Sequence, residues 1–113
     1  DYWLKHYDFG KKAKSKIGQL GRNSIENILV NTVAPLLFAY GIHKDSEDLK
    51  EKATELLSEL KAENNSIIAR WKSAGFEVKS AFDSQALIEQ FNEYCKKKQC
   101  LKCQIGADII RLA

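Results

Sequence analysis

The strongest constraint on the fold is an apolar stretch from Ile28 to Tyr40 that contains the chain's single proline, Pro35. Its apolar residues recur at helical spacing, so the stretch is predicted to form a helix. It falls short of the roughly 18 apolar residues that a membrane span needs. We therefore expect a buried helix and no membrane partner. Because Pro35 lacks an N–H and presses on the carbonyl of Asn31, the helix should kink or divide near Ala34.

Capping residues divide the rest of the chain into helices. Asn23 or Ser24 can start the helix that contains Pro35, and Gly41 can end it. Further helices are expected after the caps Asp45 or Ser46, Asn65 and Asp83 and over residues 101–112. The sequence therefore predicts an all-α fold, a single helical domain of about five helices over residues 23–113, with the kinked Pro35 helix at its centre.

Three of these helices carry more specific expectations. The helix after Asn65 should end at Gly75, where a left-handed conformation folds Phe76 back onto Trp71. The helix after it should begin with a hydrophobic staple between Phe82 and a leucine four positions into the helix. The helix over residues 46–60 has one apolar and one acidic face, and we expect the acidic face to be solvated or to bind a basic segment.

Composition describes one soluble globular domain and excludes a disordered chain, because 44% of the 113 residues are hydrophobic and 29% are charged. The net charge of +3 is unevenly divided. Residues 1–22 hold six basic and two acidic groups, residues 23–66 hold four and eight, and residues 67–113 hold eight and five. These segments can neutralise one another, so the total charge is a weak indication of a polyanionic partner.

Residues 1–22 form a basic aromatic arm, in which Tyr2, Trp3, Tyr7 and Phe9 lie among lysines. Aromatic rings next to ammonium groups can stack on single-stranded bases and bind phosphates. They can also dock the arm on its own core, which we expect because four exposed rings would leave an apolar patch. The lysines that would contact nucleic acid or another partner are Lys11, Lys12, Lys14, Lys16, Lys96, Lys97 and Lys98.

Three cysteines, Cys95, Cys100 and Cys103, are spaced C-x4-C-x2-C. They are interpreted as unliganded structural thiols, as metal ligands, or as a redox-active Cys100–Cys103 pair. Zinc prefers four thiolate or imidazole ligands, and His6 is the predicted fourth ligand because its aromatic neighbours should hold the arm against the fold. An iron–sulfur cluster on the same ligands is the other candidate cofactor.

A shared metal ion also sets a condition on the backbone. On one unbroken helix Cys95 and Cys103 would lie about 12 Å apart along the axis. The three cysteines can therefore meet only if the helix breaks near Lys98. The neighbouring lysines should also lower the pKa of the thiols.

The sequence contains no glycine-rich phosphate loop, no G-x-S-x-G and no H-E-x-x-H motif. We therefore expect no self-contained enzyme active site. The chain also contains no methionine, so we expect it to be part of a longer protein.

Several longer motifs resemble the C-terminal region of a bacterial family of unknown function. The resemblance covers nearly the whole chain and is carried by residues 2–11, 31–41, 62–67, 80–88 and 94–106. It implies a longer bacterial parent protein and strengthens His6 and the three cysteines as site candidates. No activity comes with it.

Two functions are therefore expected from the sequence. The first is a non-catalytic accessory or interaction domain of a larger cytoplasmic bacterial protein, whose partner includes the rest of that polypeptide. The alternative is a metal-containing nucleic-acid-binding module that uses the three cysteines and the lysines beside them. The oligomeric state is left open.

Overall fold

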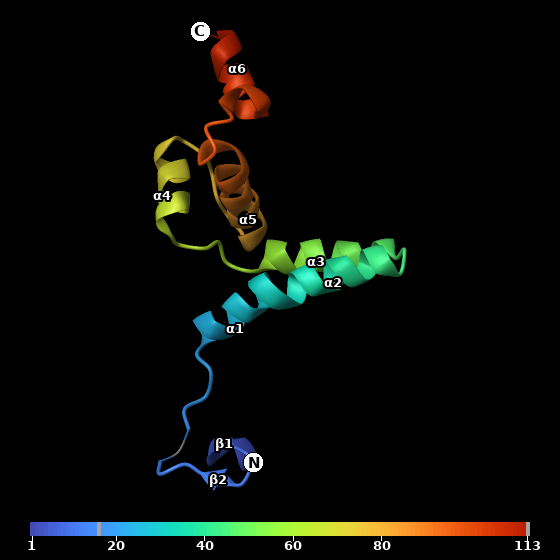
Figure 1. Cartoon of the computed structure of the whole chain (residues 1–113), viewed down its shortest axis with the longest axis vertical. Helices are drawn as coiled ribbons and strands as arrows, with labels where there is room; N and C mark the ends of the chain where they lie inside the picture. Colours follow the sequence, from blue (N-terminus) through green and yellow to red (C-terminus); the bar gives the residue numbers. More distant parts are fainter. Residues whose placement is uncertain (16, 113) are drawn as a thin grey trace.

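Helices make up most of the chain after residue 21 in the computed structural model, which describes residues 1–15 and 17–112 (Figure 1). The predominantly helical fold is confirmed. The helical elements are α1 (Arg22–Ile28), the π-helical segment η2 (Leu29–Val33), α2 (Ala34–His43), α3 (Glu47–Glu59), α4 (Ser66–Ser73), α5 (Ala81–Gln90), the π-helical segment η3 (Phe91–Cys95), the 3-10 turn η4 (Cys100–Lys102) and α6 (Gln104–Leu112).

The first three of these elements form one continuous helix from Arg22 to His43. Its irregularity lies just before Pro35, where η2 takes one additional residue into the turn and the Ala34 N–H bonds to the carbonyl of Leu29. Pro35 follows as the second residue of α2, inside the continuous helix, where its missing N–H removes one backbone hydrogen bond and the widened π-helical turn before it leaves room for its ring. The helix therefore does not divide near Ala34, because the π-helical turn accommodates the proline.

The expectation that this helix is buried is wrong. Only 17% of its most apolar 18-residue window is buried, although its length and composition would allow it to cross a membrane. Val30 and Ala34 are buried, at 5% and 1% exposed, but much of the remaining apolar surface faces outward. The physical reason is that α3 covers only one side of it.

Helices α2 and α3 run antiparallel, side by side, along one arm of the molecule (Figure 1). Ser46 caps α3 as expected, because its hydroxyl accepts a hydrogen bond from the Leu49 N–H at 3.4 Å. Gly41 does not end α2, which continues to His43. It is buried where α3 approaches, since a Cβ on Gly41 would lie 2.9 Å from Lys50 Cγ and 3.1 Å from the Lys50 nitrogen.

The end of α3 is tied to the start of α5. The Ala81 N–H donates to the carbonyl of Leu60 at 2.9 Å, and the buried Ser84 hydroxyl accepts from the Glu63 N–H at 3.2 Å. Ser80, not Asp83, is the N-cap of α5. Asp83 completes a capping box from the third helical position, so the expected staple, which required Asp83 as the cap, is wrong.

Helix α4 confirms the expected start and end. Asn65 accepts a hydrogen bond from the Ile68 N–H at 3.0 Å, and Ile68 is 1% exposed. Gly75 is left-handed, with φ of 89°, and the Phe76 N–H bonds to the carbonyl of Trp71 at 3.1 Å. The two rings meet edge to face at 4.8 Å, which is the contact expected of this terminating motif.

The arm at the N-terminus forms a small hairpin of its own. It consists of the 3-10 turn η1 (Tyr2–Leu4) and the antiparallel strands β1 (His6–Asp8) and β2 (Lys11–Lys12). The hairpin lies apart from the helices at one end of the molecule (Figure 1), so the expected docking of its rings on the helical core is wrong. The radius of gyration, 19.3 Å, is well above the roughly 13 Å of a compact chain of this length.

Candidate functional site

The three cysteines line one small pocket, which we call the thiol pocket. The break near Lys98 that a shared metal ion would require is present, because Lys98 is left-handed, with φ of 54°, and separates η3 from η4. The pocket has a volume of about 210 Å³ and an almost entirely apolar lining, formed by Trp71, Tyr94, Cys95, Cys100, Cys103, Ile105, Gly106 and Ile109.

Helix α6 closes this pocket through a close backbone contact. A Cβ on Gly106 would lie 2.9 Å from the carbonyl carbon of Cys100 and closer still to its oxygen. Cys103 is 6% exposed and accepts a hydrogen bond from the Gln90 side chain at 2.7 Å. All three cysteines are free thiols.

The expected lowering of the thiol pKa values is wrong for Cys95. Burial raises the pKa of the Cys95 thiol above its ordinary value of 9.0, and the neighbouring Cys103 and Cys100 raise this pKa further. The adjacent Lys97 pairs with Glu93 at 2.5 Å. The raised pKa favours the thiol form of Cys95 over the thiolate.

The structure does not bring His6 to the cysteines. His6 lies in the hairpin, at the opposite end of the molecule from η3 and α6 (Figure 1). Its ring stacks on Tyr2 at 3.8 Å, and its Nδ1 lies 2.8 Å from the Tyr2 carbonyl oxygen. Among residues 1–15 and 17–112, no group of three or more His, Cys, Asp or Glu side chains is placed to hold a metal ion. Metal binding by the cysteines stays a prediction, and the residues as placed do not form a closed zinc site.

The lysines singled out in the sequence fall into two separate groups. Lys12 and Lys14 line a shallow groove on the hairpin, with Lys11 beside them on β2. Lys96, Lys97 and Lys98 follow η3 near the other end of the molecule (Figure 1), and Lys16 lies outside the described residues. The two groups therefore do not form one surface.

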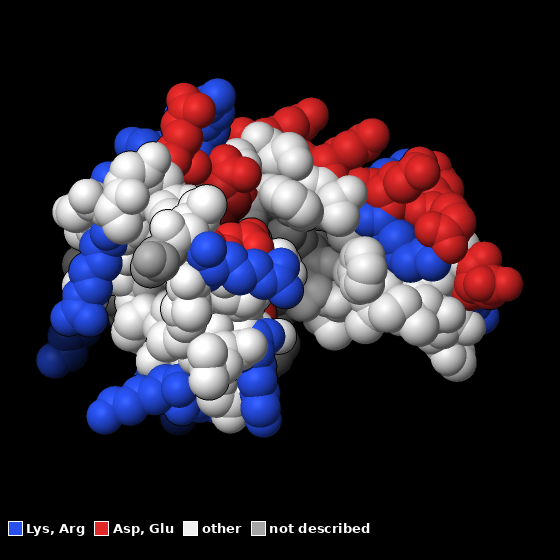
Figure 2. All heavy atoms as spheres, turned by 90° about the horizontal axis from the view of Figure 1, so that it is seen from above, with Lys and Arg blue, Asp and Glu red and all other residues white. Residues whose placement is uncertain are grey.

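The long helix carries an exposed apolar ridge that the sequence did not reveal. The ridge follows steps of three, five, three and four residues, and the step of five spans the π-helical turn. Its side chains are between 39% and 64% exposed. In Figure 2 acidic side chains gather on one side of the α2–α3 arm, beside surface that carries no charge. This surface, which we call the apolar ridge, consists of Ile25, Ile28, Val33, Leu36 and Tyr40.

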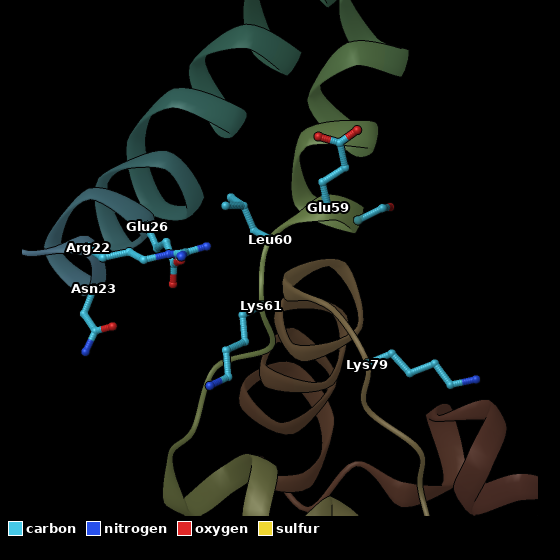
Figure 3. A pocket seen from close by; sticks show the side chains of 8 residues that line it. Arg22, Asn23, Glu26, Glu59, Leu60, Lys61 and Lys79 are labelled. Carbon is cyan, nitrogen blue, oxygen red and sulfur yellow. The ribbon is translucent and has the colours of Figure 1, made fainter.

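A larger polar pocket lies between the start of α1 and the end of α3, with a volume of about 540 Å³. Arg22 pairs with Glu26 within it, with 2.9 Å between the charged atoms. Lys61 and Lys79 point away from each other and from this pair (Figure 3). The charged side chains do not converge on a common point, so the pocket has no built ligand site.

Comparison with known proteins places part of the chain in a family. The model of a family described as protein of unknown function (DUF2851) matches residues 1–66, which include the hairpin and helices α1 to α3. No curated protein and no solved structure matches the chain. The expected membership in a family of unknown function is therefore shown for residues 1–66, and the thiol pocket lies beyond them. The bacterial origin and the C-terminal position in a longer protein stay predictions.

Proposed function

We propose that this chain, which belongs to this family of proteins of unknown function, is a non-catalytic interaction module that pairs with a second copy of itself through the apolar ridge. Membership in the family brings no activity with it. The observation that carries the proposal is the exposed ridge on a helix with no charged residue from Asn27 to Ile42. Removing such a surface from water is favourable by about 25 cal/mol per Å², and large exposed apolar patches mark interaction sites.

The spacing of the ridge favours a second copy as the partner. Its positions are nearly symmetric about Val33. When two of these helices pack antiparallel about a twofold axis near Val33, Ile25 of one copy lies opposite Tyr40 of the other, and Ile28 lies opposite Leu36. Each contact then occurs twice, as an isologous interface requires.

The ridge is also accessible without displacing α3. Val30, Ala34 and Gly41 are the buried residues of this helix, and Gly41 lies against Lys50 of α3. The helical spacing puts the ridge roughly a third of a turn away from these three residues. A helix that contacts two neighbours on adjacent sides is typical of a helical bundle. The second copy therefore completes the packing of α2 next to α3.

A lipid bilayer fits the same helix less well. Helix α3 lies along α2, and seven of its thirteen residues are charged. A helix pair inserted in a bilayer would take these charges with it, at a cost of a few kcal/mol each. The charges of α3 therefore favour a protein partner in water over a membrane.

The expected affinity follows from the size of the ridge. A 22-residue helix is about 33 Å long, and one such face is small beside the roughly 800 Å² per partner of a stable interface. We therefore expect a dimer with a dissociation constant in the micromolar range.

Leu36→Asp tests the proposal against a matched control, Ile42→Asp. The two residues are almost equally exposed, at 64% and 61%, but Ile42 lies outside the ridge. Leu36→Asp should abolish dimerisation in sedimentation velocity, and Ile42→Asp should leave it unchanged, with circular dichroism to confirm that both variants are folded. Equal behaviour of the two variants, or vesicle binding by the unaltered monomer, would contradict the proposal.

In the same proposal the chain serves a longer, cytoplasmic bacterial protein as an accessory part, in line with the resemblance in its motifs. The alternative expected from the sequence is a metal-containing nucleic-acid-binding module. It combines a metal site on the cysteines with a nucleic-acid surface, whose predicted lysines lie partly on the hairpin. The cysteines and the hairpin lie at opposite ends of the molecule (Figure 1). Nucleic-acid binding is supported by the hairpin, independently of any metal.

A further inference from the structure

We propose that the N-terminal hairpin binds single-stranded nucleic acid, with the phosphates on a groove of three lysines and the bases on exposed aromatic rings. The groove has a volume of about 550 Å³ and no carboxylate in its lining, which consists of Leu4, Lys5, Lys12, Ala13, Lys14 and Ser15. Ammonium groups beside apolar side chains suit a chain of phosphates, since each lysine can neutralise one of them.

The backbone of the hairpin brings these lysines together. The Ala13 N–H donates to the carbonyl of Lys5 at 2.7 Å, so the end of β2 lies beside the residue that precedes β1. Lys12 pairs with His6 in the strand register. Lys5 is therefore a member of the groove that its position in the sequence did not reveal.

Two rings of the hairpin are available for stacking. Tyr7 is 75% exposed and Phe9 is 79% exposed. The other rings hold the hairpin in shape, because Trp3 meets Phe9 edge to face at 5.2 Å and the Tyr2 hydroxyl accepts a hydrogen bond from the Gly10 N–H at 2.7 Å. A ring held in place loses little entropy when a base stacks on it.

The local charge of the hairpin favours this ligand over a membrane. Aromatic rings and lysines also occur together in proteins that bind membrane surfaces. In this hairpin, however, Asp8 lies between Tyr7 and Phe9 in the sequence. Its carboxylate is solvent-exposed and pairs with Lys11 at 3.4 Å. Insertion of these rings into lipid would carry the carboxylate with them. Helix α3, which carries the acidic face, lies on a separate part of the molecule from the hairpin (Figure 1). Salt screens interactions between exposed charges beyond about 10 Å, so the carboxylates of α3 repel a ligand on the hairpin only weakly.

Fluorescence anisotropy with labelled oligothymidylate and oligouridylate of about 12 nucleotides tests the proposal on the whole chain. Binding should weaken steeply between about 50 and 200 mM salt. The triple variant Lys5→Gln, Lys12→Gln, Lys14→Gln should lower the slope of log affinity against log salt by about 2, since roughly 0.7 is lost per phosphate contact on a single strand.

The aromatic variants give a different signature. Tyr7→Ala and Phe9→Ala should each weaken binding roughly ten- to a hundredfold without changing the salt slope. The matched control, Lys96→Gln with Lys97→Gln and Lys98→Gln, removes three equally basic residues at the other end and should leave binding unchanged. No binding at 50 mM salt, an equal loss in the control, or binding to anionic phosphatidylserine vesicles in place of the oligonucleotides would overturn the proposal.

Discussion

Gly106 lies directly against the backbone of Cys100, so that a Cβ on Gly106 would come within 3.1 Å of the Cys100 Cα and 2.9 Å of its carbonyl carbon. Because the contact is with backbone, it cannot be relieved by turning a side chain. The packing of α6 on the cysteine segment therefore depends on a residue without a side chain.

The first prediction concerns this contact. Gly106→Ala should destabilise the chain by roughly 1–3 kcal/mol, as overpacking does, and should increase the labelling rate of Cys103. Gly18→Ala is the control, because a Cβ on Gly18 would meet no atom within 4 Å, so this substitution should not destabilise the chain. Urea unfolding should show a larger loss for Gly106→Ala, and equal losses would contradict this contact.

The second prediction concerns the start of α5. The backbone N–H groups of Lys79 and then Ser80 bond to the Asp83 carboxylate and lower its pKa below the ordinary 3.8. A carboxyl whose pKa is lower in the folded chain stabilises the fold above pH 3.8, and this contribution is lost as the pH falls through its folded pKa. Asp83→Asn should therefore flatten the acid dependence of the unfolding free energy, and an unchanged dependence would contradict the capping box.

The cap itself has a separate measurable effect. Ser80→Ala removes the hydroxyl that accepts the Asp83 N–H and should cost about 1 kcal/mol at neutral pH. Urea unfolding at pH 7 measures it, and a loss below about 0.3 kcal/mol would show that the hydroxyl contributes little.

The third prediction concerns the reactivity of the thiols. Cys103 is buried and should react with iodoacetamide only after unfolding. Cys95 is exposed as a residue, but partial burial of its sulfur raises the pKa of the thiol above 9.0. At pH 8 Cys95 should therefore react more slowly in the folded chain than after unfolding. Mass spectrometry of the labelled peptides measures both rates, and labelling of Cys95 that is no slower in the folded chain would contradict the environment described for it.

The fourth prediction separates the cysteines from the histidine. His6 lies at the far end of the molecule (Figure 1), so any zinc or iron held by the cysteines should be retained in His6→Ala. Elemental analysis of both proteins after gel filtration measures the metal content. Loss of the metal in His6→Ala, with Cys95→Ser as the positive control for loss, would show that the hairpin reaches the cysteines.

The sequence predicts those parts of the fold that depend on neighbours along the chain. Asn65 caps α4 through a residue three positions away, and Gly75 lets Phe76 return to Trp71 within one turn. Such signals lie within a few residues of one another, so no knowledge of the distant chain is needed.

The missed features depend on contacts between distant segments. A glycine near the end of an apolar stretch indicates a helix stop, but Gly41 is required by the approach of Lys50 from α3. The prediction of His6 as a metal ligand depends on an arm that docks on the helices, and the hairpin lies apart from them (Figure 1). Apolar residues such as Leu36 predict a surface that packs against another element. The alignment of the ridge residues along one side of the helix, which favours a second copy as the partner, depends on the additional residue in the π-helical turn.

Sedimentation equilibrium of the whole chain, from about 1 µM to about 1 mM, tests self-association through the apolar ridge most directly. The account predicts a reversible shift from monomer to dimer in the micromolar range, with little dependence on salt because the ridge is uncharged. A chain that remains monomeric at the highest concentration would contradict it.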